Sequence, residues 1–264
     1  RYNLSKSKFL KLRINVPQRK EQKAIATALS DVDALIQKLD ALIEKKENIK
    51  KATMQLLLTG KKRLDGFDGE WEERKIGEVA DVIGGGTPST AVASFWNGSI
   101  NWFTPTEMVG SKYSSNSLRK ISESGLENSS AKLLPNGTIL MTSRASIGDL
   151  SILINPATTN QGFQSLVPKD SIYNEFLYYK MLLIKSRLLK YASGSTFLEI
   201  SPAKVRSILI SFPPSPDEQK AIAIALSDMD VEIEQIKSKR NKYKQIKQGM
   251  MQELLTGKIR LNGK

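Results

Sequence analysis

Apolar residues recur at helical spacing along residues 20–59 and predict one long helix there. Their spacings are three, four or multiples of these, which is typical of the seam of a coiled coil. Thr59 and Gly60 follow, and glycine commonly ends a helix. At about 1.5 Å per residue the helix would be roughly 60 Å long. The seam positions are Ile25, Leu29, Val32, Ile36, Leu39, Ile43 and Ile49.

A second segment, residues 217–256, repeats the first. Residues 21–64 align without a gap with residues 218–261, and more than half of the aligned positions are identical. Such a repeat, interrupted by unrelated sequence, favours two equivalent helices that frame another module. Because the seams match, we expect the helices to pair as an antiparallel coiled coil, with separate surface helices as the alternative. The second seam comprises Ile222, Leu226, Met229, Ile233, Ile236, Tyr243, Met250 and Leu254.

Between the helices the pattern changes to short β-type runs such as SINWF, GTILMTS and LSILIN. Turn sequences such as GGGTPS, WNGS and PNG separate these runs. Helical stretches interrupt them briefly at 122–126 and clearly at 174–191. We therefore expect an α+β fold, in which one mixed domain over residues 76–212 follows a Gly- and acid-rich linker at 60–75.

Residues 1–19 carry the pattern of a strand. Leu12, Ile14 and Val16 alternate with polar residues before a proline, as do the apolar residues of 208–212. The repeat thus extends upstream of the first helix with a shift of one residue. We expect residues 1–19 to be the tail of a preceding copy of the mixed domain.

Composition limits the chemistry that the chain can perform. The sequence has no Cys and no His, which excludes disulfides, thiolate or imidazole metal ligands and His-based proton transfer. The GGGTP string at 84–88 lacks the spacing of nucleotide-binding loops, and the acids of PDEQK at 216–220 fit a helix N-terminus better than a nuclease site. We expect no catalytic residue, no metal and no cofactor. No run of 18 apolar residues occurs, so we also expect no membrane span.

The positive charge points to a polyanionic partner. Lys and Arg number 40 against 27 Asp and Glu, a net charge of +13. Nucleic acid is the commonest such partner, and a solvated Lys-rich surface is the alternative. Loop amides and hydroxyls suit phosphates, Arg suits guanine, and Asn or Gln suits adenine. The DNA-binding candidates are Gly85, Thr87, Ser89, Trp102, Thr104, Ser143, Arg144, Asn160, Gln161, Lys190, Ser193, Ser195, Thr196 and Lys204.

Each candidate also has a structural explanation. Asn and Gln in turns often stabilise the turn itself, and Trp102 fits a hydrophobic core equally well. The Gly/Ser loop at 191–201 follows a helix with basic residues, among them Lys180, which could face DNA or solvent.

Two sets of motifs together resemble a known family. The helices share EQKAIA-AL-D-D and end in LLTGK-RL, and the intervening domain carries GGGTPST, W-TP-EM, SRASIG and TNQGF-SL. This combination is similar to the specificity (S) subunit of type I restriction–modification enzymes, the HsdS family, over essentially the whole chain.

The resemblance implies a non-catalytic subunit of the bacterial or archaeal cytoplasm that binds double-stranded DNA. Residues 76–212 would be a target recognition domain that reads one half of a bipartite sequence. The helices would form an antiparallel coiled coil that docks methyltransferase (M) subunits, and through them restriction/translocase (R) subunits. A single domain should read one half-site, and a homodimer could read a palindromic interrupted site. The alternative function is a coiled-coil scaffold whose middle domain binds protein without reading DNA sequence.

Identity between the helices is concentrated at their ends. We expect these ends to contact partners or recognition domains, so that charged residues at Leu57 and Leu254 would abolish assembly. The coil and subunit interface candidates are Ile25, Leu29, Val32, Ile36, Leu39, Ile43, Leu57, Ile222, Leu226, Met229, Ile233, Ile236, Tyr243 and Leu254.

Overall fold

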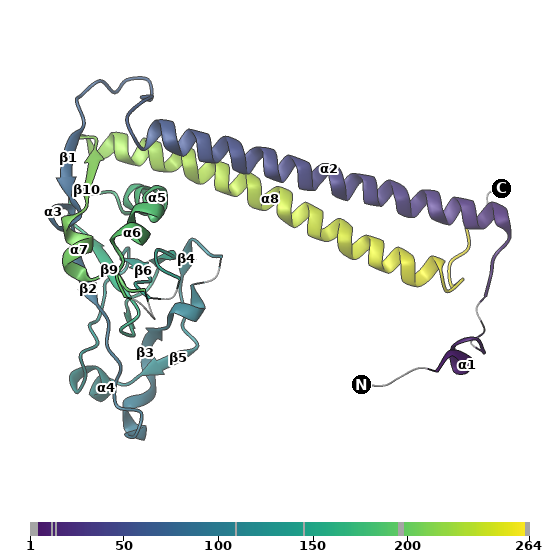
Figure 1. Cartoon of the computed structure of the whole chain (residues 1–264), viewed down its shortest axis with the longest axis horizontal. Coiled ribbons are helices and arrows are strands. Elements are labelled where there is room, and N and C mark those ends of the chain that lie inside the picture. Colours follow the sequence, from purple (N-terminus) through teal and green to yellow (C-terminus); the bar gives the residue numbers. More distant parts are fainter. Residues whose placement is uncertain are drawn as a thin grey trace. The chain divides into compact units, whose positions relative to one another are not determined.

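The computed structural model has a mixed α and β architecture (Figure 1). It describes residues 5–11, 13, 15–108, 110–144, 146–194 and 198–261. The chain divides into two compact units, one made of Arg1–Lys50 with Asp228–Lys264 and the other of Lys51–Ser227. Two 39-residue helices, α2 (Arg19–Leu57) and α8 (Pro216–Leu254), contribute to both units.

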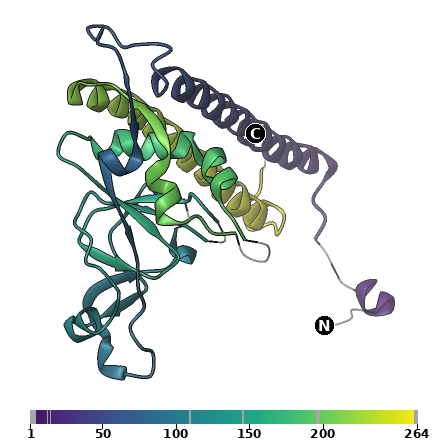
Figure 2. The ribbon, with the colours of Figure 1, turned by 60° about the vertical axis from the view of Figure 1, so that its left-hand side comes forward.

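In the first unit α2 and α8 run side by side in opposite directions, as Figures 1 and 2 both show. Ion pairs join the two helices along their length. Later residues of α2 pair with earlier residues of α8, as an antiparallel arrangement requires. The pairs are Asp33 with Lys247 at 2.6 Å, Asp40 with Arg240 at 3.1 Å, Glu47 with Lys237 at 3.0 Å, and Lys50 with Asp230. The short helix α1 (Lys6–Phe9) precedes them.

The predicted seam positions are mostly shielded from solvent. Ile25, Ile36, Leu39, Ile43, Ile233 and Leu254 are buried. The other seam residues of this unit are half-buried except Ile49, which is 42% exposed. Apolar burial along one face explains why a sequence this polar forms long helices, since isolated helices are marginal in water.

The second unit contains three sheets. β1 (Glu72–Lys75) pairs with β10 (Leu209–Phe212) in antiparallel fashion. The five-stranded sheet has the order β2 (Ala80–Gly84), β9 (Gln164–Pro168), β6 (Ile139–Met141), β7 (Leu150–Leu153) and β4 (Tyr113–Ser114). The three-stranded sheet has the order β5 (Arg119–Ile121), β3 (Trp96–Phe103) and β8 (Ala157–Thr159).

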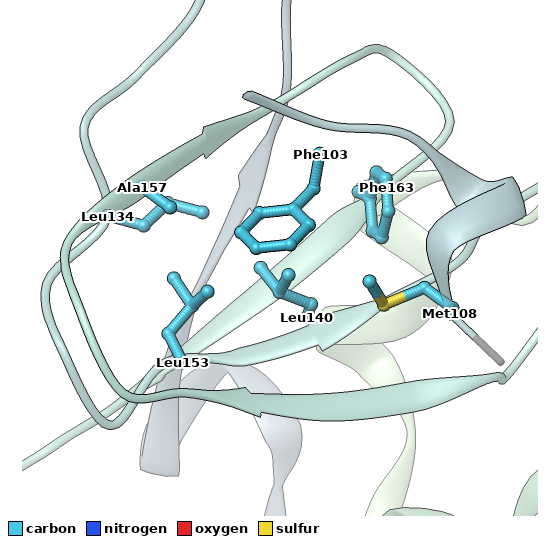
Figure 3. Packing of buried hydrophobic residues seen from close by; sticks show 7 residues of the cluster. All are labelled: Phe103, Met108, Leu134, Leu140, Leu153, Ala157 and Phe163. Carbon is cyan, nitrogen blue, oxygen red and sulfur yellow. The ribbon is translucent and has the colours of Figure 1, made fainter. Parts of the chain in front are cut away.

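Short helices connect and cover these strands. They are α3 (Ile76–Val79), η1 (Ala93–Phe95), η2 (Pro105–Glu107), α4 (Glu123–Glu127), α5 (Asn174–Leu183), α6 (Lys185–Tyr191) and α7 (Pro202–Ser207). Helix α5 is buried along most of its length and contacts β7. A core cluster joins β3 to the five-stranded sheet, and Figure 3 shows the Phe103 ring facing Leu140 at its centre. Phe163 belongs to the same cluster, so the loops that follow β3 and β8 start from a rigid base.

The structure differs from the sequence-based expectation in several places. The helical stretch expected at 174–191 breaks at Ile184 into α5 and α6. Strand β1 lies within the expected linker. No strand is found among the described residues of 5–19; Arg13 and residues 15–18 are irregular, and Leu12 and Ile14 lie outside the described residues.

Candidate nucleic-acid interface

The loop at 84–90 packs directly on the loop at 158–164. The Gly86 N–H donates to the Thr159 carbonyl at 2.8 Å, and the Thr87 hydroxyl donates to Gln161 Oε1 at 2.7 Å. A Cβ at Gly85 would lie 2.0 Å from the Asn160 carbonyl, so only glycine permits this approach. Two candidate segments far apart in sequence thus form one surface.

Two tryptophans hold the 84–90 loop from beneath. The Trp102 indole N–H donates to the Gly86 carbonyl at 2.8 Å, and the Trp96 indole N–H donates to the Ser89 carbonyl at 3.1 Å. The Arg119 guanidinium lies 3.7 Å from the centre of the Trp96 ring, and the two indoles meet edge to face. Trp102 is only 4% exposed, so its contacts are with the loop rather than with solvent.

Trp96 and Arg119 were not among the sequence-based candidates. The signal that could have found them is the presence of two tryptophans, Trp96 and Trp102, on a single strand, with a basic strand pairing beside it.

A third loop, after β3, joins the same surface. The Asn160 N–H donates to the Phe103 carbonyl at 3.0 Å. The N–H and hydroxyl of Thr104 both donate to Glu107 Oε2, at 2.7 and 2.8 Å. This reciprocal cap fixes Thr104 at the start of η2. The Asn160 side chain is also engaged, since its Oδ1 accepts the Gly162 N–H at 2.8 Å.

The Arg144 segment is tied to this surface by its backbone. The Ser143 N–H donates to the Gly162 carbonyl at 2.7 Å, and the Ile200 N–H donates to the Ser143 carbonyl at 3.1 Å. Ser143 is fully buried, whereas Arg144 is exposed and forms an ion pair with Glu199, with Nε and Oε1 2.9 Å apart. Ser193 exchanges two backbone hydrogen bonds with Glu199.

The remaining candidates are placed less centrally. Ser89, Lys190 and Lys204 are exposed. Ser195 and Thr196 lie outside the described residues. Among the described residues, no hydrogen bond ties Lys190 or Lys204 to the loop surface.

Lys180 is buried rather than exposed on a basic helix face. It is 3% exposed, and its ammonium donates to the Leu58 carbonyl and, at 3.1 Å, to the Ser211 hydroxyl. Burial, followed by the charge of Arg187, lowers its pKa to about 7. Lys180 therefore binds the end of α2 and is unavailable to DNA.

The C-termini of α2 and α8 form the same hydrogen-bonded motif. After α2, Gly60 has φ +70° and the Lys62 N–H donates to the Leu56 carbonyl at 3.1 Å. After α8, Gly257 has φ +76° and the Ile259 N–H donates to the Glu253 carbonyl at 3.1 Å. At both ends a glycine in the left-handed conformation follows the last helical turn, a position that favours glycine because it has no Cβ.

Each motif then places an arginine on the first turn of the opposite helix. Arg63 binds Glu218 through Nε and Nη2 at 2.5 and 2.7 Å, and Arg260 binds Glu21 through the same atoms at 2.7 and 2.5 Å. The hydrogen bonds from Arg260 hold the pKa of Glu21 below its usual value. Such two-point arginine–carboxylate pairs fix geometry as well as charge.

The α8 motif borders an apolar pocket within the first unit. Its volume is about 320 Å³, and it is lined by Asn15, Val16, Pro17, Gln22, Ile25, Ala26, Leu29, Leu254 and Leu255. Leu255 is 54% and Val16 is 68% exposed.

The described residues offer neither a metal site nor a membrane-spanning helix. Among those residues no group of three or more acidic, His or Cys side chains could hold a metal ion. None of the helices described is long and apolar enough to cross a membrane.

Known proteins resemble the chain in both sequence and fold. The MjaIX type I restriction enzyme specificity subunit of Methanocaldococcus jannaschii is 41% identical over 65% of this chain and 40% of its own length. The EcoR124I/EcoR124II specificity subunit of Escherichia coli is 34% identical over 60% of this chain and 40% of its own length. The chain therefore spans well under two thirds of these relatives.

Solved structures agree on the fold. The HsdS subunit of Thermoanaerobacter tengcongensis superposes with a TM-score of 0.57 at 21% identity, over 93% of this chain and 60% of that one. A chain from a type I R-M system studied for complex assembly and conformational transition gives 0.61 at 22% identity, over 92% of this chain and 61% of that one. The model of the type I restriction modification DNA specificity domain matches residues 68–248. Because this match covers more than half of the sequence, the chain belongs to that family, as its motifs predicted.

Proposed function

We propose that the chain reads one half of a bipartite double-stranded DNA sequence and performs no catalysis itself. The observation that carries this proposal is the convergence of the candidate loops. Gly86 is bonded to Thr159, Asn160 to Phe103, and Ser143 to Gly162, so four separate segments meet on one surface. Loops held on a rigid scaffold are the usual carriers of specificity.

The chemistry of this surface suits DNA. Ser89 supplies a hydroxyl for phosphates, while Gln161 and Arg144 supply side chains that match base edges. The net charge of +13 adds sequence-independent attraction.

Selection of DNA from a random duplex pool by the full chain tests the proposal. We expect one short motif to be enriched, and the affinity for it to fall with salt at a log–log slope of about −0.9 per phosphate contact. Binding with no sequence preference, or with no salt dependence, would favour the alternative of a coiled-coil scaffold that binds protein.

We further propose that residues 76–212 are a single target recognition domain and that α2 and α8 pair as an antiparallel coiled coil. The ion pairs between Asp33 and Lys247 and between Asp40 and Arg240 support the pairing. Along this coil the chain would dock methyltransferase subunits, and through them restriction subunits.

We also propose that the pocket beside Leu255 is a binding surface for a second domain. Its lining corresponds through the repeat to residues around Leu58, Ile222 and Leu226, which are fully buried by the second unit. We propose that a second recognition domain covers the pocket, supplied by a preceding copy ending in residues 1–19 or by a second chain in a homodimer.

A further inference from the structure

Thr87 and Gln161 form a side-chain pair between two loops that are also joined by a backbone hydrogen bond. The Thr87 hydroxyl donates to Gln161 Oε1 at 2.7 Å. Gln161 is exposed and Thr87 is half-buried, so the pair lies at the surface of the loop cluster. The backbone bond from Gly86 to the Thr159 carbonyl, at 2.8 Å, holds the two loops together beside it.

The pair rests on a framework that leaves little room for movement. Added Cβ atoms would come within 2.0 Å of the Asn160 carbonyl at Gly85 and within 2.3 Å of the Ala131 nitrogen at Gly86. The Trp102 indole N–H donates a hydrogen bond to the Gly86 carbonyl at 2.8 Å. Thr87 is therefore presented at a defined position, which is what a group that orients another side chain requires.

The neighbouring amide has a different task. Asn160 Oδ1 accepts the Gly162 N–H at 2.8 Å and so closes the turn that carries Gln161. Asn160 is half-buried, and turning its carboxamide toward a base would break the bond that closes this turn. Of the two amides suited to adenine, Gln161 is the exposed one, and within the described part of the chain its side chain is hydrogen-bonded to Thr87 through Oε1.

We propose that Gln161 reads an adenine and that Thr87 is its positioning residue; this rests on the DNA-reading function proposed above. The bond from Thr87 to Oε1 fixes the orientation of the Gln161 amide. Oε1 keeps a second lone pair for the adenine N6 amino group, and Nε2 donates to N7. Thr87 itself need not touch the base.

Selection from a random duplex pool by full-length variants tests this inference. Q161A is expected to reduce the preference for adenine at one position by about ten-fold or more, as loss of a two-point base contact should. T87V, which removes the hydroxyl at nearly constant volume, is expected to reduce the same preference several-fold. T87S keeps the hydroxyl and should restore it.

Two further readouts separate positioning from a merely structural role. T87V should add nothing in a Q161A background, because the two residues act on one base. The salt slope of binding should be the same in all variants, because no phosphate contact is removed. N160A serves as the contrast and should weaken preference at more than one position through the turn.

The outcomes are distinct. If the wild-type chain enriches no sequence, the DNA-reading function and this inference both fall. If it enriches a motif that Q161A and T87V leave unchanged, or if T87V alters several positions equally, the inference alone is wrong.

Discussion

The C-termini of α2 and α8 share a sequence and a set of hydrogen bonds, yet they differ in what covers their apolar side chains. Leu58 is fully buried, whereas its counterpart Leu255 is 54% exposed. Gln219 binds the Ser171 and Pro213 carbonyls and the Tyr173 N–H, whereas for its counterpart Gln22 the described bond is to the Pro17 carbonyl.

The difference separates two properties of the motif. Its folding is local, because the glycine turn and the arginine clamp form at both helix ends regardless of cover. Its second property, as a packing surface, depends on the domain that covers it. At the α2 end that domain buries the apolar side chains and contributes Lys180, which binds the helix end. The same residues can therefore be kept at both helix ends as a packing surface for a domain, although only the α2 end is covered by one in this structure.

Removing the arginine clamp should affect the α2 end most. Arg63 pairs with Glu218, a carboxylate that is 1% exposed, so R63A leaves a buried charge without its partner. Breaking such a pair costs about 3–5 kcal/mol. Urea unfolding of R63A should show this as a lower midpoint at an unchanged slope.

R260A is the matched control for that experiment. The side chains of Arg260 and Glu21 are 53% and 7% exposed, against 23% and 1% for Arg63 and Glu218, so water replaces the lost bonds more readily and we expect a smaller shift of the midpoint. Equal shifts for the two variants would mean that cover by the mixed domain contributes nothing to the α2 motif.

Lys180 should make the α2 end sensitive to pH. Its pKa is lowered to about 7 in the folded chain from an ordinary value of 10.5. Between these values the unfolded chain binds more protons, so the free energy of unfolding rises with pH through this window. At about 1.4 kcal/mol per pKa unit, the gain from pH 7 to pH 9 is at most about 3 kcal/mol.

K180M should flatten this rise when unfolding is measured from pH 7 to pH 9. K185M is the control, because Lys185 is partly exposed and pairs with Asp149 instead. A wild-type profile that is flat over this range, or one that K180M leaves unchanged, would contradict a buried neutral amine at the end of α2.

The long helices were predictable because their information is local. Seam residues recur at a constant spacing, so α2 (Arg19–Leu57) and α8 (Pro216–Leu254) lie within two residues of the expected segments at each end. Strand β1 was missed because its charged residues EERK carry no alternation, and it forms by pairing with β10 far along the chain.

The candidate site was predictable in composition but not in arrangement. The sequence pointed to Gln161 and Asn160 equally, since both amides suit adenine. Only the three-dimensional contacts distinguish them, because Asn160 binds Gly162 in its own turn and Gln161 meets Thr87 from another loop. Trp102 was likewise a surface candidate until its indole was found beneath the Gly86 carbonyl.

A charged substitution at Leu255 should have the smallest effect on the stability of the folded chain and the largest effect on its assembly. Leu57 and Leu254 are both buried, so a charge there would unfold the helix ends and could not isolate docking. Leu255 is already exposed, so L255D should leave the thermal midpoint nearly unchanged. A charge in the pocket should nevertheless exclude an apolar partner. Light scattering, alone and with the methyltransferase, should therefore find two-copy assemblies for the wild-type chain and none for L255D. V231D places the same charge at an equally exposed site of α8 outside the pocket and should assemble normally. If L255D assembles as the wild type does, the pocket is not a seat for a second recognition domain, and the repeated helix end is retained for its local fold alone.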